Sequence, residues 1–326
     1  MIAFLFVFCF GLLVGFAIEW RIDAAREAEA VFGFQKIHPF NNHFKFINPL
    51  LGFDSSEKKH GAYSPLENKL QTYIGDPQVS GRAADISVYF RNLENGDWVG
   101  VNEDTEYDPA SLLKVPIMIY YLKLAESDPS VLSRTYAYTA SDLANLKLAP
   151  GNELSTRLVE NKFYTVEELI IEMIMRSDNI AKYLLILNSN QKDLNDIYGE
   201  LGVLIHKEGN TYVISARTYS LFFRTLYNAT FLNQGMSEEA LKILSKAEFK
   251  DGLVAGVPSD INVAHKFGQY ATVRNGKVTS VEAHDCGIIY HIKSPYLLCV
   301  MTRGNDTKQL EEIIQQISRL TYDFIK

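Results

Sequence analysis

The pattern of hydrophobic and polar positions changes from strand-like to helical and back again along the chain. After a predicted helix from Ser64 to about Tyr73, apolar and polar residues alternate in residues 86–90, and Asn95-Gly96 separates this stretch from residues 98–101. This arrangement predicts a β-hairpin. From Val115 to about Ser245, apolar residues recur instead at the three- and four-residue spacing of amphipathic helices.

Strand-like segments return in the last quarter of the chain. We expect strands at residues 263–266, 287–292 and 296–302, and a final helix after Asn305-Asp306-Thr307. Strands and helices at both ends around a helical middle predict an α/β (α+β) fold. In it, an antiparallel sheet is flanked by N- and C-terminal helices and carries an inserted all-helical subdomain.

The same pattern suggests where the subdomains begin and end. We assign residues 64–110 and 251–326 to the sheet subdomain and residues 111–250 to the helical subdomain. An active site is expected at the seam between such a pair.

Residues 1–18 contain no charged side chain. At about 1.5 Å per residue a helix of this length covers roughly 27 Å, which is just enough to cross a bilayer core. We predict a membrane anchor, with residues 19–63 as a tether and the rest of the chain on the extracytoplasmic face. A cleaved signal peptide is the alternative, because Gly15-Phe16-Ala17 has the small-x-small form of a cleavage site, and the protein would then be secreted.

Composition narrows the possible partners. The 326-residue chain is 47% hydrophobic and carries a formal net charge of −7, which argues against a general nucleic-acid binder. Its seven histidines show no metal-ligand spacing, and it has no Gly-x-x-x-x-Gly-Lys loop, so we expect no metal and no cofactor.

The three cysteines give little information about compartment. Cys9 lies in the apolar leader, and Cys286 and Cys299 lie in two arms of a hairpin that should turn near Ser294-Pro295. A symmetric pairing about that turn would not place the two sulfur atoms opposite each other. We therefore expect no disulfide.

The strongest candidate for chemistry is Ser111, which comes three residues before Lys114 where an apolar segment begins. Helical residues three apart share a face, so the lysine would stand beside the serine hydroxyl. Apolar neighbours disfavour a charged amine and so make lysine a usable base. An ordinary helix cap followed by a surface lysine is the alternative, because serine is a favoured cap and Ser-x-x-Lys also begins at Ser55, Ser56 and Ser189.

Two further motifs follow in the chain. Ser177-Asp178-Asn179 lies between two apolar runs of the helical middle, and Lys266-Phe267-Gly268 closes a predicted strand. In this order and setting the three motifs resemble those of the class A β-lactamase and D,D-peptidase superfamily of serine hydrolases. The resemblance covers roughly residues 64–326.

The resemblance implies a role for each matching residue. Ser111 would be the acylated nucleophile, Lys114 its base, and Ser177 the group that passes a proton to the leaving nitrogen in the positive field of Lys266. Asn179, Phe267 and Gly268 would line the substrate site, and the backbone N–H groups of Ser111 and Gln269 would form the oxyanion hole. Asp178 would be structural.

Two departures from the family pattern bear on the reaction. The family usually has a hydroxyl residue between the lysine and glycine of the third motif, and Phe267 stands there, which puts recognition of a substrate carboxylate in doubt. Class A β-lactamases also carry a Glu-x-x-x-Asn loop whose glutamate activates the deacylating water. Between Leu201 and Leu221 this sequence is absent, and Glu208, the only acid there, fits a turn better than a catalytic role.

Three functions remain open from the sequence. The first is a membrane-tethered serine hydrolase, acylated on Ser111 by a β-lactam or a cell-wall peptide amide, with slow deacylation. The second is a true β-lactamase that uses a different deacylation base. The third is a non-catalytic envelope-binding protein that keeps the fold.

Overall fold

The computed structural model describes residues 44–49, 61–145, 156–201, 203, 206–208 and 211–326. All of these residues belong to one compact unit. The predicted anchor at residues 1–18 and most of the predicted tether lie outside the described residues. Among the residues described, no helix is both long enough and apolar enough to span a bilayer.

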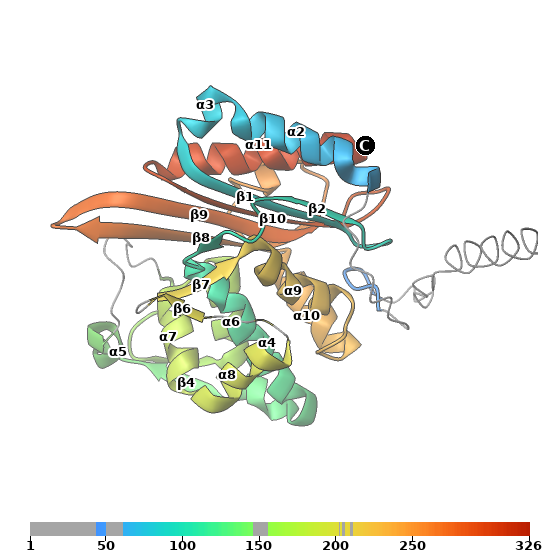
Figure 1. Cartoon of the computed structure of the whole chain (residues 1–326). Helices are drawn as coiled ribbons and strands as arrows, with labels where there is room; N and C mark the ends of the chain where they lie inside the picture. Colours follow the sequence, from blue (N-terminus) through green and yellow to red (C-terminus); the bar gives the residue numbers. More distant parts are fainter. Residues whose placement is uncertain (1–43, 50–60, 146–155, 202, 204–205, 209–210) are drawn as a thin grey trace, which may run out of the picture. The chain divides into compact units, whose positions relative to one another are not determined.

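A five-stranded antiparallel sheet lies at the centre of this unit, with strand order β2-β1-β10-β9-β8 (Figure 1). Its strands are β1 (Ala83–Asn92), β2 (Trp98–Val101), β8 (Val263–Arg274), β9 (Lys277–Ile289) and β10 (Tyr296–Gly304). Because β1 pairs with β10, both ends of the described chain contribute to one sheet, as the sequence predicted.

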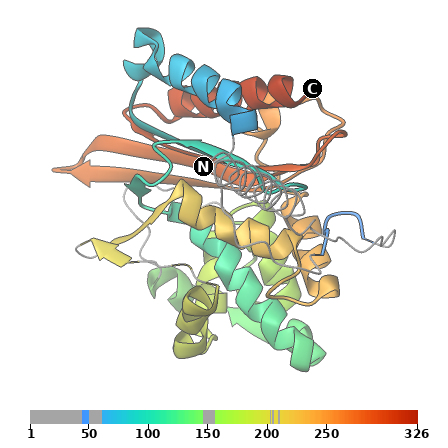
Figure 2. The ribbon, with the colours of Figure 1, turned by 45° about the vertical axis from the view of Figure 1, so that its right-hand side comes forward.

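Helices from the two ends of the chain cover one face of the sheet (Figures 1 and 2). They are α2 (Ser64–Gly75), α3 (Pro77–Ser80) and α11 (Thr307–Ile325), and the short 3₁₀ helix η1 (Gly61–Tyr63) precedes α2. The apolar sides of α2 and α11 pack with Val88, Phe90 and Val300 of the sheet into one buried cluster. Asp306 caps α11 by accepting a hydrogen bond from the backbone N–H of Gln309, as the polar residues there suggested.

The middle of the chain lies against the other face of the sheet (Figure 1). Its helices are α4 (Lys114–Ser127), η3 (Pro129–Ser133), α5 (Ala140–Asn145), α6 (Val166–Met175), α7 (Asn179–Leu187), α8 (Gln191–Glu200), α9 (Ala216–Tyr227) and α10 (Gln234–Leu244). The short 3₁₀ helix η4 (Val254–Gly256) follows them in the chain and packs against α11, where Gln315 donates a hydrogen bond to the carbonyl of Ala255 at 3.2 Å.

The prediction of an all-helical insert was wrong in detail. β4 (Thr135–Tyr138) pairs with β5 (Lys162–Thr165), and β3 (Glu106–Tyr107), β7 (Thr211–Ser215) and β6 (His206–Glu208) form a small sheet. These segments lie outside the helices. By pairing with each other they provide hydrogen-bond partners for backbone N–H and C=O groups that have none within a helix.

The expectation about the cysteines was also wrong. Cys286 of β9 lies directly opposite Cys299 of β10, and the two form a disulfide with their Cα atoms 4.0 Å apart. Ile289 pairs with Tyr296, so the turn is centred earlier in the chain than Ser294-Pro295. Since the turn sets the register of a hairpin, this shift brings the two cysteines together.

The segment at residues 44–49 is fixed to the helical part of the unit. A carboxylate of α10, that of Glu238, accepts hydrogen bonds from the backbone N–H groups of Lys45, Phe46 and Ile47 at 2.8–3.0 Å. The side chains of Phe46 and Ile47 are buried in the same core as the helices. This part of the predicted tether therefore packs on the folded unit.

Candidate active site

Ser111 lies in a tight 3₁₀ turn, η2 (Ala110–Leu113), immediately before α4. The sequence placed it at the start of an apolar helix, and the structure places that start at Lys114. The Asp108 carboxylate accepts a hydrogen bond from the backbone N–H of Ala110 at 2.7 Å, and Ala110 has a φ of +48°. A non-glycine residue rarely adopts this conformation, so the carboxylate helps to hold a strained turn at the nucleophile candidate.

Two side chains of β9 hold the start of this turn against the sheet. Glu282 accepts from the backbone N–H of Asp108 at 3.0 Å, and His284 donates from Nε2 to the Asp108 carbonyl, also at 3.0 Å. His284 Nδ1 accepts from the backbone N–H of Thr302 at 3.3 Å, which is consistent with a proton on Nε2. Neither residue was predicted from the sequence, although two polar residues two apart in a buried strand were a usable signal.

Gly268 explains how β8 approaches this turn. A Cβ atom at Gly268 would stand 3.1 Å from the carbonyl oxygen of Pro109 and 3.1 Å from Leu112. A side chain would therefore push the strand away from η2. Gln269, the next residue, extends its side chain to Glu311 of α11 at 2.6 Å, on the opposite face of the strand.

Lys114 is completely buried at the centre of the site. Its Nζ donates to Ser111 Oγ, Ser177 Oγ and Asn179 Oδ1, each at 2.9 Å, and also to the carbonyl of Ser177. Burial lowers the pKa of Lys114 well below its usual range, and the nearby cations of Lys266 and Lys182 lower it further. A buried amine with this pKa can exist as the neutral base.

Ser177 connects the two buried lysines. Its Oγ lies 2.9 Å from Lys114 Nζ and 3.1 Å from Lys266 Nζ, and its backbone φ is +58°. Lys266 also donates to the carbonyl of Phe267 at 2.8 Å. Burial lowers the pKa of Lys266 to about 7, and the Asp285 carboxylate opposes that shift.

Asp178 is fully buried and caps α7 by accepting from the backbone N–H of Ala181 at 2.9 Å. This contact orients the helix that begins at Asn179. The capping contact agrees with the structural role expected for Asp178.

The structure thus brings together five of the side chains that the sequence singled out, from three distant parts of the chain: Ser111, Lys114, Ser177, Asn179 and Lys266. A neutral Lys114 could take the Ser111 proton, and Ser177 could carry a proton onward. Such a set is suited to acyl transfer through a serine ester. Within the described residues, no group of three or more His, Cys, Asp or Glu side chains is arranged to hold a metal ion.

Residues 65–325 match the sequence model of the Beta-lactamase enzyme family. The chain belongs to this family. The match covers most of the chain and all the motifs described above, and it makes the protein a serine hydrolase by family. No curated protein sequence gives a significant match.

Solved structures share the fold of this β-lactamase-family chain. PBP-A is 20% identical and covers 80% of this chain and 96% of its own, with a TM-score of 0.66. A β-lactamase from Chitinophaga pinensis is 20% identical over 81% of this chain and 100% of its own, with a TM-score of 0.68. A class A β-lactamase from Mycobacterium abscessus is 21% identical over 79% and 98%, with a TM-score of 0.66.

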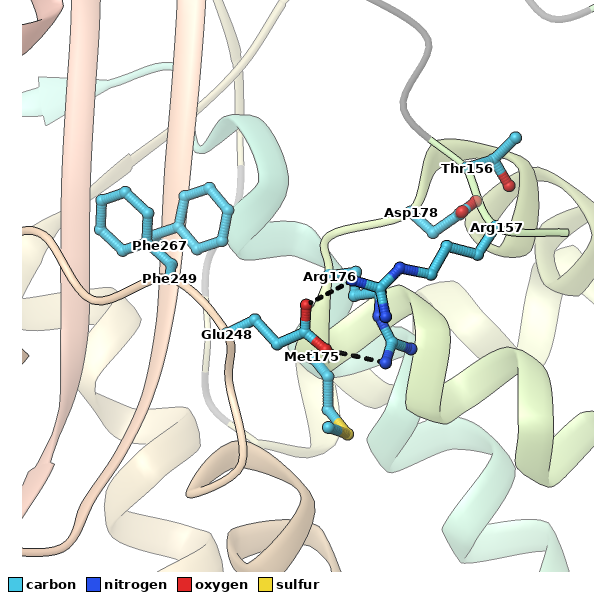
Figure 3. A pocket seen from close by; sticks show the side chains of 8 residues that line it. All are labelled: Thr156, Arg157, Met175, Arg176, Asp178, Glu248, Phe249 and Phe267. Carbon is cyan, nitrogen blue, oxygen red and sulfur yellow. Dashed lines mark hydrogen bonds and ion pairs between the residues drawn. The ribbon is translucent and has the colours of Figure 1, made fainter.

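Phe267 gives this family member an aromatic wall where a hydroxyl was expected. Its ring stacks on that of Phe249, with centroids 4.1 Å apart and planes 17° apart, and Lys266 Nζ lies 4.0 Å from the Phe267 centroid. Figure 3 shows both rings close together on one side of a cavity of about 210 Å³.

The far side of the same cavity carries charged side chains that already have partners. Glu248 pairs with Arg176 at 2.7 Å and with Arg157 at 3.1 Å (Figure 3). Arg176 also pairs with Glu172. With Glu248 in place, these guanidinium groups are partly neutralised and do not simply replace the missing hydroxyl as carboxylate anchors.

Glu208 is the only acid between Leu201 and Leu221, where the Glu-x-x-x-Asn sequence is missing. It is the last residue of β6 and lies opposite Thr211 of β7, which agrees with the expected turn. Its side chain is outside the described part of the structure.

Proposed function

We propose that this chain is a membrane-tethered, extracytoplasmic serine hydrolase that is acylated on Ser111 by a β-lactam or a cell-wall peptide amide and deacylates slowly. The observation that carries this proposal is the buried Lys114 amine. It contacts Ser111 Oγ and Ser177 Oγ at the same distance of 2.9 Å. A single base therefore links the nucleophile to a proton donor.

Acylation follows from these contacts. Neutral Lys114 takes the Ser111 proton as Oγ forms a bond to the substrate carbonyl carbon, and the carbonyl oxygen gains the negative charge. The backbone N–H groups of Ser111 and Gln269 stabilise that oxyanion. When the intermediate collapses, the C–N bond breaks and an ester remains on Ser111.

The leaving nitrogen receives its proton from Ser177. The Ser177 hydroxyl gives up its proton and regains one from the Lys114 ammonium, so the lysine returns to its neutral form. A protonated Lys266 at 3.1 Å favours negative charge on Ser177 Oγ during this transfer. Asn179 orients the Lys114 amine and contributes a binding group for the substrate amide.

Slow deacylation is proposed because hydrolysis of the ester needs a further base to activate water. The Glu-x-x-x-Asn sequence that supplies it in class A β-lactamases is missing between Leu201 and Leu221. General-base assistance contributes roughly 10²- to 10⁴-fold. If a working hydrolase turns over near a typical ~10 s⁻¹, the acyl-enzyme here should last from about ten seconds to many minutes.

Intact-mass spectrometry over time after addition of penicillin G tests the proposal. A structure of a PBP-A variant is described as an acyl-enzyme complex with this compound, which makes it a suitable first probe. We expect one adduct per chain, on Ser111, that persists while free drug remains in solution, with little hydrolysed drug.

Other outcomes would favour the alternative functions. Fast turnover that disappears in Glu208→Gln would make the protein a β-lactamase with a different deacylation base. No adduct from several β-lactams, in a protein that is folded by circular dichroism, would favour a non-catalytic binding protein.

The anchor has its own test. The apolar residues 1–18 support membrane tethering, and a chain expressed with them should sediment with membranes, whereas a chain that starts at residue 19 should not. Release of the full-length chain in a shortened form would indicate a cleaved leader.

A further inference from the structure

A second cavity, of about 520 Å³, is lined by Ala110 and Leu113, which stand on either side of Ser111 in the sequence of η2. Most of its lining is apolar and comes from η2, α4, α7 and α8, including Ala110, Leu113, Ile117, Ile186, Leu194 and Tyr198. Its volume lies in the range of small-molecule sites. The described residues therefore provide room for a sizeable apolar group beside the nucleophile.

The two cavities border the reaction centre through different residues. The smaller one is lined by Asp178 and Phe267, which are sequence neighbours of Ser177 and Lys266, whereas the larger one is lined by Ala110 and Leu113 beside Ser111. They share no lining residue. Because the leaving nitrogen must face Ser177 to receive its proton, the leaving portion of a substrate points to the smaller cavity. The acyl portion, which stays on Ser111, then points to the larger one.

Among the described residues that line the larger cavity, Lys182 is the one cation. It stands one helical turn after Asn179, so the two side chains share a face of α7. Within the described part of the chain, its amine forms no hydrogen bond or ion pair. Burial lowers the pKa of Lys182, and the Asp108 carboxylate opposes the shift.

An unpaired, half-buried amine in an apolar cavity is unfavourable until an acceptor reaches it. The Asp108 carboxylate is near enough to raise the pKa of Lys182, but among the described residues no hydrogen bond or ion pair joins the two side chains. The apolar lining of the cavity suits an apolar chain, and the Lys182 amine suits an anion at the end of that chain.

We propose that this cavity is an acyl-side subsite that selects substrates whose acyl portion is an apolar chain ending in a carboxylate, with Lys182 as the specificity-determining cation. This inference rests on the proposed acylation of Ser111. The apolar stem would pack on Leu113 and Ile117, and the carboxylate would accept hydrogen bonds from the Lys182 ammonium. It adds a chemical class of substrate to a function that otherwise specifies only an amide.

Two penicillins with the same nucleus test the subsite. One carries a 5-carboxypentanoyl side chain and the other a hexanoyl side chain, so they differ only in the terminal carboxylate. The ratio of their acylation rate constants, measured by intact mass, should be roughly tenfold in favour of the anionic compound, which corresponds to about 1.4 kcal/mol. In Lys182→Met, which keeps the apolar stem, the ratio should fall to about one, and Lys182→Arg should retain the preference.

Lys192→Met is the matched control. Lys192 lies on α8, pairs with Asp196 at 2.8 Å, and its side chain is 81% exposed, so its loss removes the same charge without touching the cavity. Its ratio should equal that of the wild type. An unchanged ratio in Lys182→Met, or a wild-type ratio of one or less, would overturn the proposal. If Lys182→Met does not fold, the rate ratio of the wild type is measured at high salt instead. A preference for the anionic compound that is lost at high salt supports the proposal, and a preference that salt leaves unchanged counts against it.

Equilibrium binding of both penicillins to Ser111→Ala, by calorimetry, separates this inference from the proposed function. Tighter binding of the anionic compound that disappears in Ser111→Ala/Lys182→Met supports the subsite even if the wild type is never acylated. Equal binding of the two compounds rejects the subsite even if the wild type is acylated normally.

Discussion

The Nζ atom of Lys266 lies 3.1 Å from the Oγ atom of Ser177, a residue 89 positions earlier in the chain. This contact joins the edge strand of the sheet to the loop between two helices. Lys114 reaches the same hydroxyl from its other side at 2.9 Å. Both buried lysines therefore contact the same oxygen atom, so the charge of each affects proton transfer at Ser177.

Ser111→Ala should abolish covalent labelling by a fluorescent penicillin while leaving the fold intact, because the hydroxyl is the attacking group and a half-buried serine contributes little packing. Labelling is measured on denaturing gels, and the fold by circular dichroism. Ser189→Ala is the matched control, since Ser189 also begins a Ser-x-x-Lys sequence but its hydroxyl bonds to near neighbours, donating to the carbonyl of Ile186 and accepting from Gln191. Equal labelling of Ser111→Ala and wild type would show that Ser111 is not the nucleophile.

Lys114→Ala should lower the acylation rate about 10²- to 10⁴-fold, the usual range for loss of a general base. Lys114→Arg should be nearly as slow, because a guanidinium cannot become a neutral base. Rates are measured as adduct formation in the mass spectrum. Wild-type rates in Lys114→Ala would place the base elsewhere.

Acylation should fall on both sides of a pH optimum. At low pH, protonated Lys114 cannot accept the Ser111 proton, and above about pH 7 Lys266 loses the charge that assists Ser177. The Lys266 cation also lowers the pKa of Lys114. Lys266→Met should therefore raise the pKa of Lys114, move the acid limb to higher pH and remove the alkaline limb. The profile is measured between about pH 4 and pH 10, a range that extends to both sides of the Lys266 pKa of about 7.

The control for the pH experiment is Lys277→Met, because Lys277 is exposed where β9 begins, at the turn from β8. Its profile should match that of the wild type. An acid limb that stays in place in Lys266→Met would mean that the two lysines are not coupled in this way.

Phe267→Thr should raise the acylation rate toward β-lactams that carry a carboxylate on the nucleus, by about tenfold or more. The new hydroxyl would add one hydrogen bond to the substrate carboxylate beside Lys266, and bonds to charged groups contribute on the order of 1.5 to 3 kcal/mol. Phe249→Thr is the control, because it also breaks the ring stack but places no hydroxyl next to Lys266. Slower or unchanged acylation in a folded Phe267→Thr would assign the ring to a differently shaped pocket.

Replacing both Cys286 and Cys299 by alanine should lower the free energy of unfolding by roughly 2 to 4 kcal/mol, because the disulfide closes a loop with a sequence separation of 13. Urea denaturation measures the change, and the reduced wild type should lose a similar amount. Two thiols at these positions that react with a thiol reagent in the denatured, unreduced protein would show that the bond is absent.

The sequence by itself determined the elements that depend on local information. The proline near the start of α2, the alternation in β1 and the polar cap before α11 are each read from neighbouring residues, and these elements formed close to where they were expected. The three motifs also indicated which side chains would meet, because the chemistry of acyl transfer requires a particular set of groups.

Tertiary structure decided what depends on packing and register. The disulfide follows from the way β9 and β10 turn, and the pairing of Asp108 with Glu282 and His284 joins segments that are far apart in the chain. The lowered pKa values of Lys114 and Lys266 come mainly from burial, which no local pattern specifies. Lys182 looks like an ordinary helix-surface lysine in the sequence, and only the packing of α7 and α8 beside η2 places it in a cavity next to Ser111.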